Sequence, residues 1–311
     1  MKTYYGSDSL AHPLTKAVVA LGNFDGVHLG HQYLLAQARK RAEELQGQLV
    51  VYTFSPHPAH VLAPQKDLPL IQTPKQKLRT LENLGVDVCI VEKFSKEFAL
   101  ERPENFVKNI LMDLVGAVAV VVGYDFTFGF HRSGSVEQLE ALGEKYLLEV
   151  EIVPAKFLDE MLLSSSKIRT YIREGEVGAA LKMLGRPYTL VGKVIKGEGR
   201  GGQLGFHTAN IEPENMLLPG SGVYLTKTKI ETHPDQWWKS VTSIGFNPTF
   251  HQGHRSIETH LLDFEEQVVD KKIEVEFLDK IRDQIAFSAE KDLSKQIGKD
   301  VEMARKTFKR I

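Results

Sequence analysis

Two patterns of hydrophobic and polar positions divide this chain of 311 residues into two halves. In the first half, short runs of apolar residues alternate with segments whose apolar residues recur at helical spacing. Such apolar runs are typical of parallel strands, because these strands are buried on both faces. They lie at residues 17–21, 48–54, 86–94, 117–123 and 148–154. The alternation predicts an α/β fold with a doubly wound parallel sheet and ligands at the carboxyl ends of its strands.

The segments between these runs predict helices, and one of them has clear ends. Thr73 and Pro74 are typical of a helix start, with an N-cap oxygen followed by proline in the first turn, and Gly85 is typical of a helix end. The proline-rich stretch 55–64 predicts a loop. The other helices are expected at residues 30–45, 103–115, 135–146 and 166–184.

The second half has a different pattern. From Tyr188 onward, β-branched residues and alternating positions predominate, punctuated by glycine and proline clusters. These features predict antiparallel strands that form a small β-barrel. The charged, periodic segment from Ser288 to Arg310 predicts a C-terminal helix with Ser288 as its N-cap. We therefore expect two domains, residues 1–185 and 186–311.

Composition narrows the class of protein. The chain has 39 basic and 40 acidic residues, a formal net charge of −1. A general nucleic-acid binder carries a basic surplus, so we expect no nucleic-acid partner, although a local anion site is not excluded. The single cysteine, Cys89, lies in an apolar run and is expected to be a buried, inert thiol. The sequence contains no secretory signal and no apolar run of membrane-spanning length, so we expect a soluble, cytoplasmic protein without a membrane partner. The oligomeric state is not predicted.

The first chemical motif follows the first apolar run. It reads Gly-Asn-Phe-Asp-Gly-Val-His-Leu-Gly-His over residues 22–31 and leads into a helix. Backbone N–H groups and the positive end of a helix favour an anion there. His28 and His31 can donate hydrogen bonds to phosphate oxygens that gain charge during transfer. Two alternatives are a metal site, which lacks a nearby cysteine or acidic cluster, and ordinary surface histidines.

This motif resembles that of the H-x-G-H nucleotidyltransferase superfamily, and more narrowly the prokaryotic bifunctional riboflavin kinase/FMN adenylyltransferase (FAD synthetase) family. Two further blocks are similar to family elements: GYDFTFG at residues 123–129 and SSSKIR at residues 164–169. The resemblance implies a Rossmann-like domain in which FMN attacks the α-phosphorus of ATP to give FAD and pyrophosphate. It implies catalytic roles for His28 and His31. The implied ATP and flavin contacts are Gly22, Phe24, Asp25, Gly30, Asp125, Ser164, Ser165, Ser166 and Arg169.

The second motif is rich in glycine. Residues 197–202 read Gly-Glu-Gly-Arg-Gly-Gly, but no helix pattern follows, which argues against a dinucleotide-binding turn. A glycine-rich flap over phosphates fits better, and a plain hairpin is the alternative. Thr208-Ala209-Asn210 follows the flap, and Glu258 lies in a later alternating segment, where it is expected to share a strand face with His260.

The second half resembles the riboflavin kinase domain of the same family. The resemblance implies that Thr208 and Asn210 hold Mg²⁺ and ATP phosphates, since oxygen ligands suit this ion. It implies that Glu258 is the base that accepts a proton from the ribityl hydroxyl, because a hydroxyl is a poor nucleophile until its proton is accepted. Gly199 and Gly201 are the expected phosphate contacts of the flap. The similar segments SIGFNPTF and IETHLLDF span residues 243–250 and 257–264.

Together the motifs predict a bifunctional enzyme that phosphorylates riboflavin to FMN and adenylylates FMN to FAD, with ATP and Mg²⁺. The second half departs from the family pattern at His207, where proline is usual, and at residues 265–270. Three alternatives remain: an adenylyltransferase with a degenerate kinase half, a non-catalytic flavin-binding regulator or nucleic-acid partner, and a related H-x-G-H enzyme with another acceptor.

Overall fold

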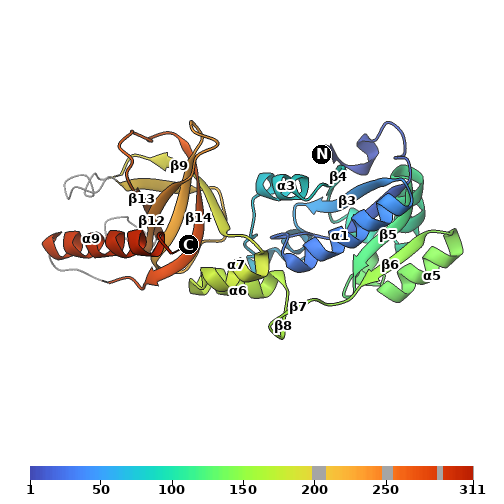
Figure 1. Ribbon diagram of the computed structural model, residues 1–311. Helices are drawn as coiled ribbons and strands as arrows, with labels where there is room; N and C mark the ends of the chain where they lie inside the picture. The colour runs from blue at the N-terminus through green and yellow to red at the C-terminus, as the bar shows by residue number, and fades with distance from the viewer. Residues whose placement is uncertain (198–207, 247–254, 286–289, 311) are drawn as a thin grey trace. The chain divides into compact units, whose positions relative to one another are not determined.

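The computed structural model of the chain describes residues 1–197, 208–246, 255–285 and 290–310. The chain divides into two compact units (Figure 1). The first contains residues 1–69 and 74–164, and the second contains residues 70–73 and 165–311. Within the described ranges, no helix is both long and apolar enough to cross a membrane.

The first unit is built on a six-stranded parallel sheet with the strand order β1-β4-β3-β2-β5-β6, so the predicted doubly wound sheet is confirmed. The chain winds outward from β2 through β3 to β4, and then returns to the other side of β2 with β5. This reversal makes the carboxyl ends of β2 and β5 the switch point, where such sheets bind ligands. The strands are β1 Lys2–Tyr5, β2 Ala17–Leu21, β3 Gln48–Ser55, β4 Val88–Lys93, β5 Ala117–Gly123 and β6 Glu149–Val153.

Helices cover both faces of this sheet. Val18 and Ala20 of β2 pack in one buried cluster with side chains of α1 (Leu29–Glu44) and α3 (Pro74–Asn83). Val19 and Leu21 pack in the cluster on the other face, with side chains of the helix over residues 103–114 and of α5. β2 is therefore buried on both sides, as its apolar run predicts. These last helices are α4 Pro103–Asn105, its π-helical continuation η4 Phe106–Leu114, and α5 Val136–Tyr146.

One predicted loop of the first unit contains a helix. The proline-rich stretch forms α2 (Pro58–Leu62), because Pro58 suits the first turn and His57 caps the helix, its Nδ1 accepting from Ala59 N at 3.1 Å. The other short elements of the unit are η1 Ser7–Ser9, η2 Pro64–Lys66, η3 Phe98–Leu100, η5 Phe130–Arg132 and the hairpin of β7 Phe157–Leu158 and β8 Met161–Leu162.

The second unit is a closed antiparallel barrel, as predicted, with the strand order β10-β13-β12-β11-β14-β9. Helices α6 (Ser165–Glu174) and α7 (Val177–Leu184) belong to this unit by their contacts, although the sequence pattern groups them with the first half. The boundary between residues 185 and 186 stays a prediction. The strands are β9 Tyr188–Ile195, β10 Thr208–Pro213, β11 Gly222–Ile230, β12 Trp238–Phe246, β13 Arg255–Leu261 and β14 Lys272–Arg282.

Hydroxyl groups line part of the barrel core. Thr226 bonds to Ser240 and Thr242 at 2.8 Å each, and Thr242 bonds to Thr259 at 2.8 Å. These four side chains are fully buried, so each hydroxyl is satisfied by its neighbours and not by water. The bonds join β11, β12 and β13. Through Thr259 they hold the inner face of β13, the strand whose outer face carries Glu258.

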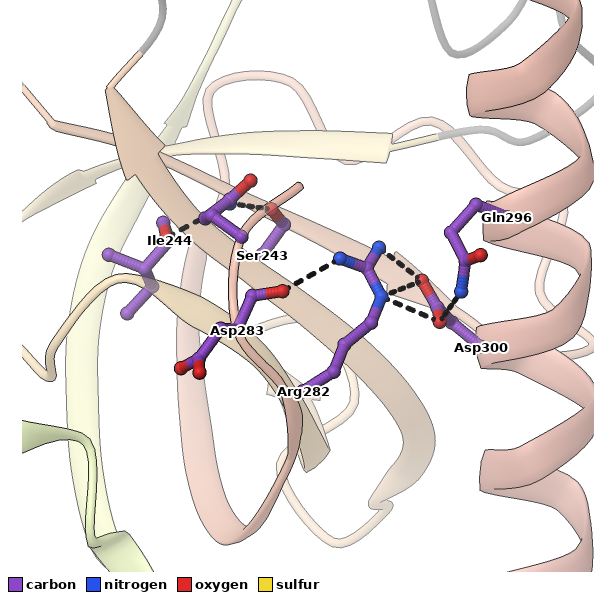
Figure 2. A network of polar contacts seen from close by, with 7 residues as sticks. Ser243, Ile244, Arg282, Asp283, Gln296 and Asp300 are labelled. Atoms are coloured by element: carbon purple, nitrogen blue, oxygen red, sulfur yellow. Dashed lines mark hydrogen bonds and ion pairs between the residues drawn. The ribbon is translucent and has the colours of Figure 1, made fainter. Parts of the chain in front are cut away.

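Helix α9 (Glu290–Thr307) is the described part of the predicted C-terminal helix; Ser288 lies outside the described residues. An apolar cluster that includes Ala304 and Phe308 packs it on the barrel. Figure 2 shows a second attachment, in which Arg282 from the end of β14 reaches Asp300 of α9. Its guanidinium donates to both carboxylate oxygens, with Nε–Oδ1 at 2.9 Å and Nη2–Oδ2 at 2.7 Å. A paired fork of this kind fixes orientation as well as distance.

Candidate active sites

The turn after β2 is tightly wound. Phe24, Gly26 and Val27 have φ values of 50°, 80° and 40°. A β-branched residue at positive φ is a conformational outlier, and such strain persists only where the surroundings hold it. Phe24 and Val27 are fully buried, and Asp25 is 5% exposed. Packing therefore holds the turn that leads to the two histidines.

The two histidines form a stacked pair at the start of α1. His28 is the N-cap, and its Nδ1 accepts a hydrogen bond from the backbone N of His31 at 3.3 Å. The ring centroids lie 3.7 Å apart with an interplanar angle of 17°. Phe24 contacts the His31 ring edge-on at 5.2 Å. The pair thus stands at the positive end of a sixteen-residue helix, where an anion is stabilised.

Gly30 brings the helix backbone close to His28. A Cβ added at Gly30 would lie 3.1 Å from both Nδ1 and Cε1 of the His28 ring. The glycine therefore leaves room for the stacked His28 ring, in addition to the close approach to an anion that the sequence suggests.

The turn after β5 lies at the same sheet edge as the histidine turn, because β2 and β5 are neighbours. It is closed by a bond from Phe126 N to Gly123 O at 3.0 Å, and Asp125 is exposed within it. The Phe126 and Phe128 rings stack at 5.6 Å and join the sheet core. The structure thus brings Asp125 and Asp25 to the carboxyl ends of adjacent strands.

The serine run stands at the junction of the two units. Ser164 ends the first, and Ser165 and Ser166 open α6 in the second. Arg169 is 6% exposed, so this arginine of α6 is buried and not solvated. The predicted role of these residues beside the histidines stays a prediction. Gly199 and Gly201 of the flap, and His207 after it, lie outside the described residues.

The barrel brings the remaining predicted residues together through strand register. Asn210 of β10 is directly opposite Glu258 of β13, and Thr208 is opposite His260. Directly opposed side chains in antiparallel strands lie on one face, with Cβ atoms about 5 Å apart. Ile257 and Thr259 are buried while Glu258 and His260 are half-buried, which confirms the predicted alternation. Three oxygen-bearing side chains thus gather on one outer face of the barrel.

A glycine also supports this site. A Cβ added at Gly197, where the flap begins, would lie 2.1 Å from Nδ2 of Asn210. The flap therefore starts with its backbone directly against the Asn210 amide. No other residue fits there without a shift of the flap or the amide.

Two contacts near the sites were not found from the sequence. Ser243 of β12 is opposite Glu258 on the side away from Asn210, and its Oγ accepts from Gln284 Nε2 at 2.9 Å. In the first unit, Lys77 Nζ lies 3.3 Å from the Asn23 carbonyl and 3.1 Å from Thr53 Oγ1. Neither Gln284 nor Lys77 belongs to a motif, because each reaches its partner only through the fold.

Cys89 plays no part in either site. It is fully buried in β4, and burial raises the pKa of its thiol to about 12. The thiol is therefore protonated at neutral pH, in agreement with the inert role expected from the sequence. Among the described residues, no group of three or more His, Cys, Asp or Glu side chains is arranged to hold a metal ion.

Comparison with known proteins decides the family. A family model described as FAD synthetase matches residues 11–167, and one described as riboflavin kinase matches residues 184–308. The bifunctional riboflavin kinase/FMN adenylyltransferase of Bacillus subtilis is 36% identical and covers 95% of this chain and 94% of its own. That of Buchnera aphidicola (subspecies Schizaphis graminum) is 33% identical over 100% of both chains. The chain belongs to the bifunctional riboflavin kinase/FMN adenylyltransferase family.

A solved structure from Streptococcus pneumoniae shares the fold of this bifunctional family member. Its TM-score is 0.89 at 31% identity, and it covers 98% of this chain and 99% of its own. That structure is described as a macrolide-efflux protein. The two family models, in contrast, match one half of the chain each: FAD synthetase the parallel-sheet half and riboflavin kinase the barrel half.

Proposed function

We propose that the chain makes FMN from riboflavin at the barrel site and FAD from FMN at the parallel-sheet site, with ATP as the donor in both reactions. Membership of the family gives the two activities. One observation in each half supports the assignment of sites: the His28–His31 stack at a helix N-terminus, and the register that sets Asn210 opposite Glu258. Since both reactions use ATP, we also propose that the protein acts in the cytoplasm.

In the adenylyl transfer, an FMN phosphate oxygen attacks the α-phosphorus of ATP. The bond from that phosphorus to the bridging oxygen breaks, and pyrophosphate leaves with the electron pair. His28 and His31 donate hydrogen bonds to the phosphate oxygens that gain charge, and the helix end adds its partial positive charge. Positioning and charge stabilisation suffice for this chemistry, because no covalent enzyme intermediate is required.

We also assign the other predicted contacts to the adenylyl-transfer reaction. The turn of Gly22, Phe24 and Asp25 holds the histidine stack, and Asp125 approaches from the neighbouring strand. We assign the ATP phosphates to the hydroxyls of Ser164, Ser165 and Ser166 and to the guanidinium of Arg169, whose planar fork suits phosphate oxygens.

In the phosphoryl transfer, Glu258 accepts the proton of the ribityl 5′-hydroxyl as that oxygen attacks the γ-phosphorus of ATP, and ADP leaves. General-base assistance of this kind contributes about 10²–10⁴ in rate. The neighbours of Glu258 suit Mg²⁺, because Thr208 and Asn210 offer oxygen ligands on the same outer face. We assign them to the ion, which when bound neutralises phosphate charge. Gly199 and Gly201 are assigned to the phosphate flap.

The test is a product assay with the full chain, riboflavin or FMN, ATP and Mg²⁺, followed by chromatography of the flavins. We expect His31→Ala to stop FAD formation while FMN accumulates. We expect Glu258→Gln to slow FMN formation about 10²-fold or more while added FMN still becomes FAD. His12→Ala and Glu302→Gln, which change exposed residues of the same types, serve as controls and are expected to leave both rates unchanged.

The outcomes separate the alternatives. FAD formation from FMN without FMN formation from riboflavin would select the degenerate kinase, whose basis is His207 and residues 265–270. Residues 265–270 form an exposed loop in which Asp270 pairs with Lys193 at 2.7 Å, while Thr208, Asn210 and Glu258 are all present. If neither product forms, the protein is not the proposed enzyme, and a non-catalytic flavin binder is favoured.

A further inference from the structure

A triangle of polar contacts between Thr53, Lys77 and the exposed residue Asn23 anchors the turn that leads to the histidines. Thr53 Oγ1, at the end of β3, donates to the backbone carbonyl of Asn23 at 3.1 Å. Lys77 Nζ, from α3, donates to the same carbonyl at 3.3 Å and to Thr53 Oγ1 at 3.1 Å. Thr53 is fully buried and Lys77 is half-buried. The triangle therefore joins β3 and α3 to Asn23, the residue directly before the Phe24–Val27 turn.

The position of Asn23 connects these hydrogen bonds to the two histidines. The next residues include Phe24 and Val27, both at positive φ, and the turn ends at His28, the cap of α1. A strained backbone relaxes when the groups that hold it are removed. Any shift of the Asn23 carbonyl would thus pass along four residues to the stacked rings.

Stability alone does not explain a lysine at this place. Burial lowers the pKa of Lys77, and the neighbouring Cys89 and Asp25 offset this only in part. Because the pKa is lower in the folded chain than in the unfolded chain, the ammonium reduces stability at neutral pH, and this cost disappears only when the pH rises above both values. Methionine would fill the same space without a charge. The Asn23 carbonyl would keep its bond from Thr53, so no buried group would be left unpaired.

We propose that Lys77 is a positioning residue for adenylyl transfer: with Thr53, it holds the Asn23 carbonyl so that the following turn presents His28 and His31 in their stacked arrangement. This proposal rests on the proposed function of the parallel-sheet site. Lys77 acts through Asn23 and Thr53 and does not touch the substrates. Its charge strengthens both hydrogen bonds, which are stronger from an ionised donor.

The test compares Lys77→Met with Lys75→Met in the full chain, because Lys75 is an exposed lysine two residues away on the same helix. We expect Lys77→Met to lower kcat for FAD formation from FMN by about tenfold to a hundredfold, since small misplacements have effects of this size. We expect KM for FMN and ATP to change by less than about threefold, and Lys75→Met to match the wild type. FMN formation from riboflavin, an activity of the other unit, stays unchanged.

Hydrogen exchange separates positioning from simple support of the fold. Amides of β2 and β3 report unfolding of the first unit, and we expect them to exchange no faster in Lys77→Met than in the wild type. Faster exchange together with lost activity would reduce Lys77 to a structural residue and overturn the proposal. A raised KM with an unchanged kcat would make Lys77 a substrate contact and would overturn it as well.

Thr53 supplies an independent variant. Thr53→Val removes the hydroxyl and keeps the shape, whereas Thr53→Ser keeps the hydroxyl. We expect Thr53→Val to lower kcat like Lys77→Met, Thr53→Ser to retain it, and the double variant Lys77→Met with Thr53→Val to lose less than the product of the two single losses. Independent, multiplicative losses would overturn the proposal. A wild-type protein that forms no FAD would instead refute the proposed function, which separates the two failures.

Discussion

At the scale of one residue, Gly30 shows how the lack of a side chain affects the placement of the candidate catalytic histidines. The sequence indicates a glycine between two histidines at a helix start, and close approach to an anion is the natural expectation. In the structure the glycine packs against the His28 ring, with Leu163 as its other neighbour. The lack of a Cβ at Gly30 therefore leaves room for the His28 ring in its stacked position, which a larger residue would crowd.

Gly30→Ala is expected to lower FAD formation about tenfold, because the new methyl group meets the His28 ring at 3.1 Å and displaces it from the stack. Alanine is the better helix former by about 1 kcal/mol, so α1 itself is not expected to weaken. The flavin product assay measures the effect, and FMN formation from riboflavin serves as the internal reference.

The control for this substitution is Gly298→Ala. A Cβ at Gly298 of α9 meets nothing within 4 Å, so both activities are expected to be retained. Equal FAD formation in Gly30→Ala and Gly298→Ala would show that the glycine contact has no catalytic consequence.

At the scale of elements, the sequence pattern predicts most strands but not β1. Residues 2–5 read Lys-Thr-Tyr-Tyr, a short segment without an apolar run, yet they pair in parallel with β4. The pairing is supported by Glu92 of β4, which accepts from Ser7 N and from Tyr52 Oη at 3.0 and 2.6 Å. Burial and this neighbouring carboxylate raise the pKa of Tyr52, so the phenol remains a donor. Such support comes from residues distant in sequence.

The attachment of α9 carries a prediction at the same scale. Asp300→Ala is expected to destabilise the barrel unit by about 3 kcal/mol, because it leaves the Arg282 guanidinium largely buried without its carboxylate (Figure 2). Urea unfolding followed by tryptophan fluorescence reports on this unit, since Trp237 and Trp238 both lie in it.

Asp292→Ala provides the comparison for Asp300→Ala, because Asp292 is an exposed aspartate of the same helix. We expect it to change the free energy of unfolding by less than about 0.5 kcal/mol, as is usual for exposed positions. Equal effects of the two substitutions would mean that the Arg282–Asp300 pair contributes no net stability. Gln296, which also donates to Asp300, would then be the next residue to examine.

At the scale of the whole molecule, the histidine stack and the Asn210–Glu258 pair lie in separate compact units with separate cores. The contacts that form the histidine stack and the Asn210–Glu258 register each lie within one unit. Of the residues assigned to adenylyl transfer, only Ser165, Ser166 and Arg169 belong to the second unit. We therefore expect an equimolar mixture of His31→Ala and Glu258→Gln proteins to convert riboflavin to FAD, with a lag while FMN made by one protein reaches the other.

Chromatography of the flavins over time measures this exchange. Either variant alone with riboflavin is the control, and neither is expected to give appreciable FAD. The mixture could also fail to make FAD although each protein retains its own single activity. FMN would then not leave the barrel site where it is made, and the two units would not act independently.

The amino-acid pattern alone was enough to predict the two fold classes, and it located the motifs from which the candidate site residues were proposed. Local pattern suffices there, because parallel strands are apolar throughout, barrel strands alternate, and residues 22–31 and 208–210 are contiguous motifs. Only the tertiary structure decided which distant residues meet. Strand register sets Ser243 and Asn210 beside Glu258, and helix packing delivers Lys77 to Asn23. These contacts depend on the closing of a barrel and the stacking of a helix on a sheet, which no local periodicity encodes.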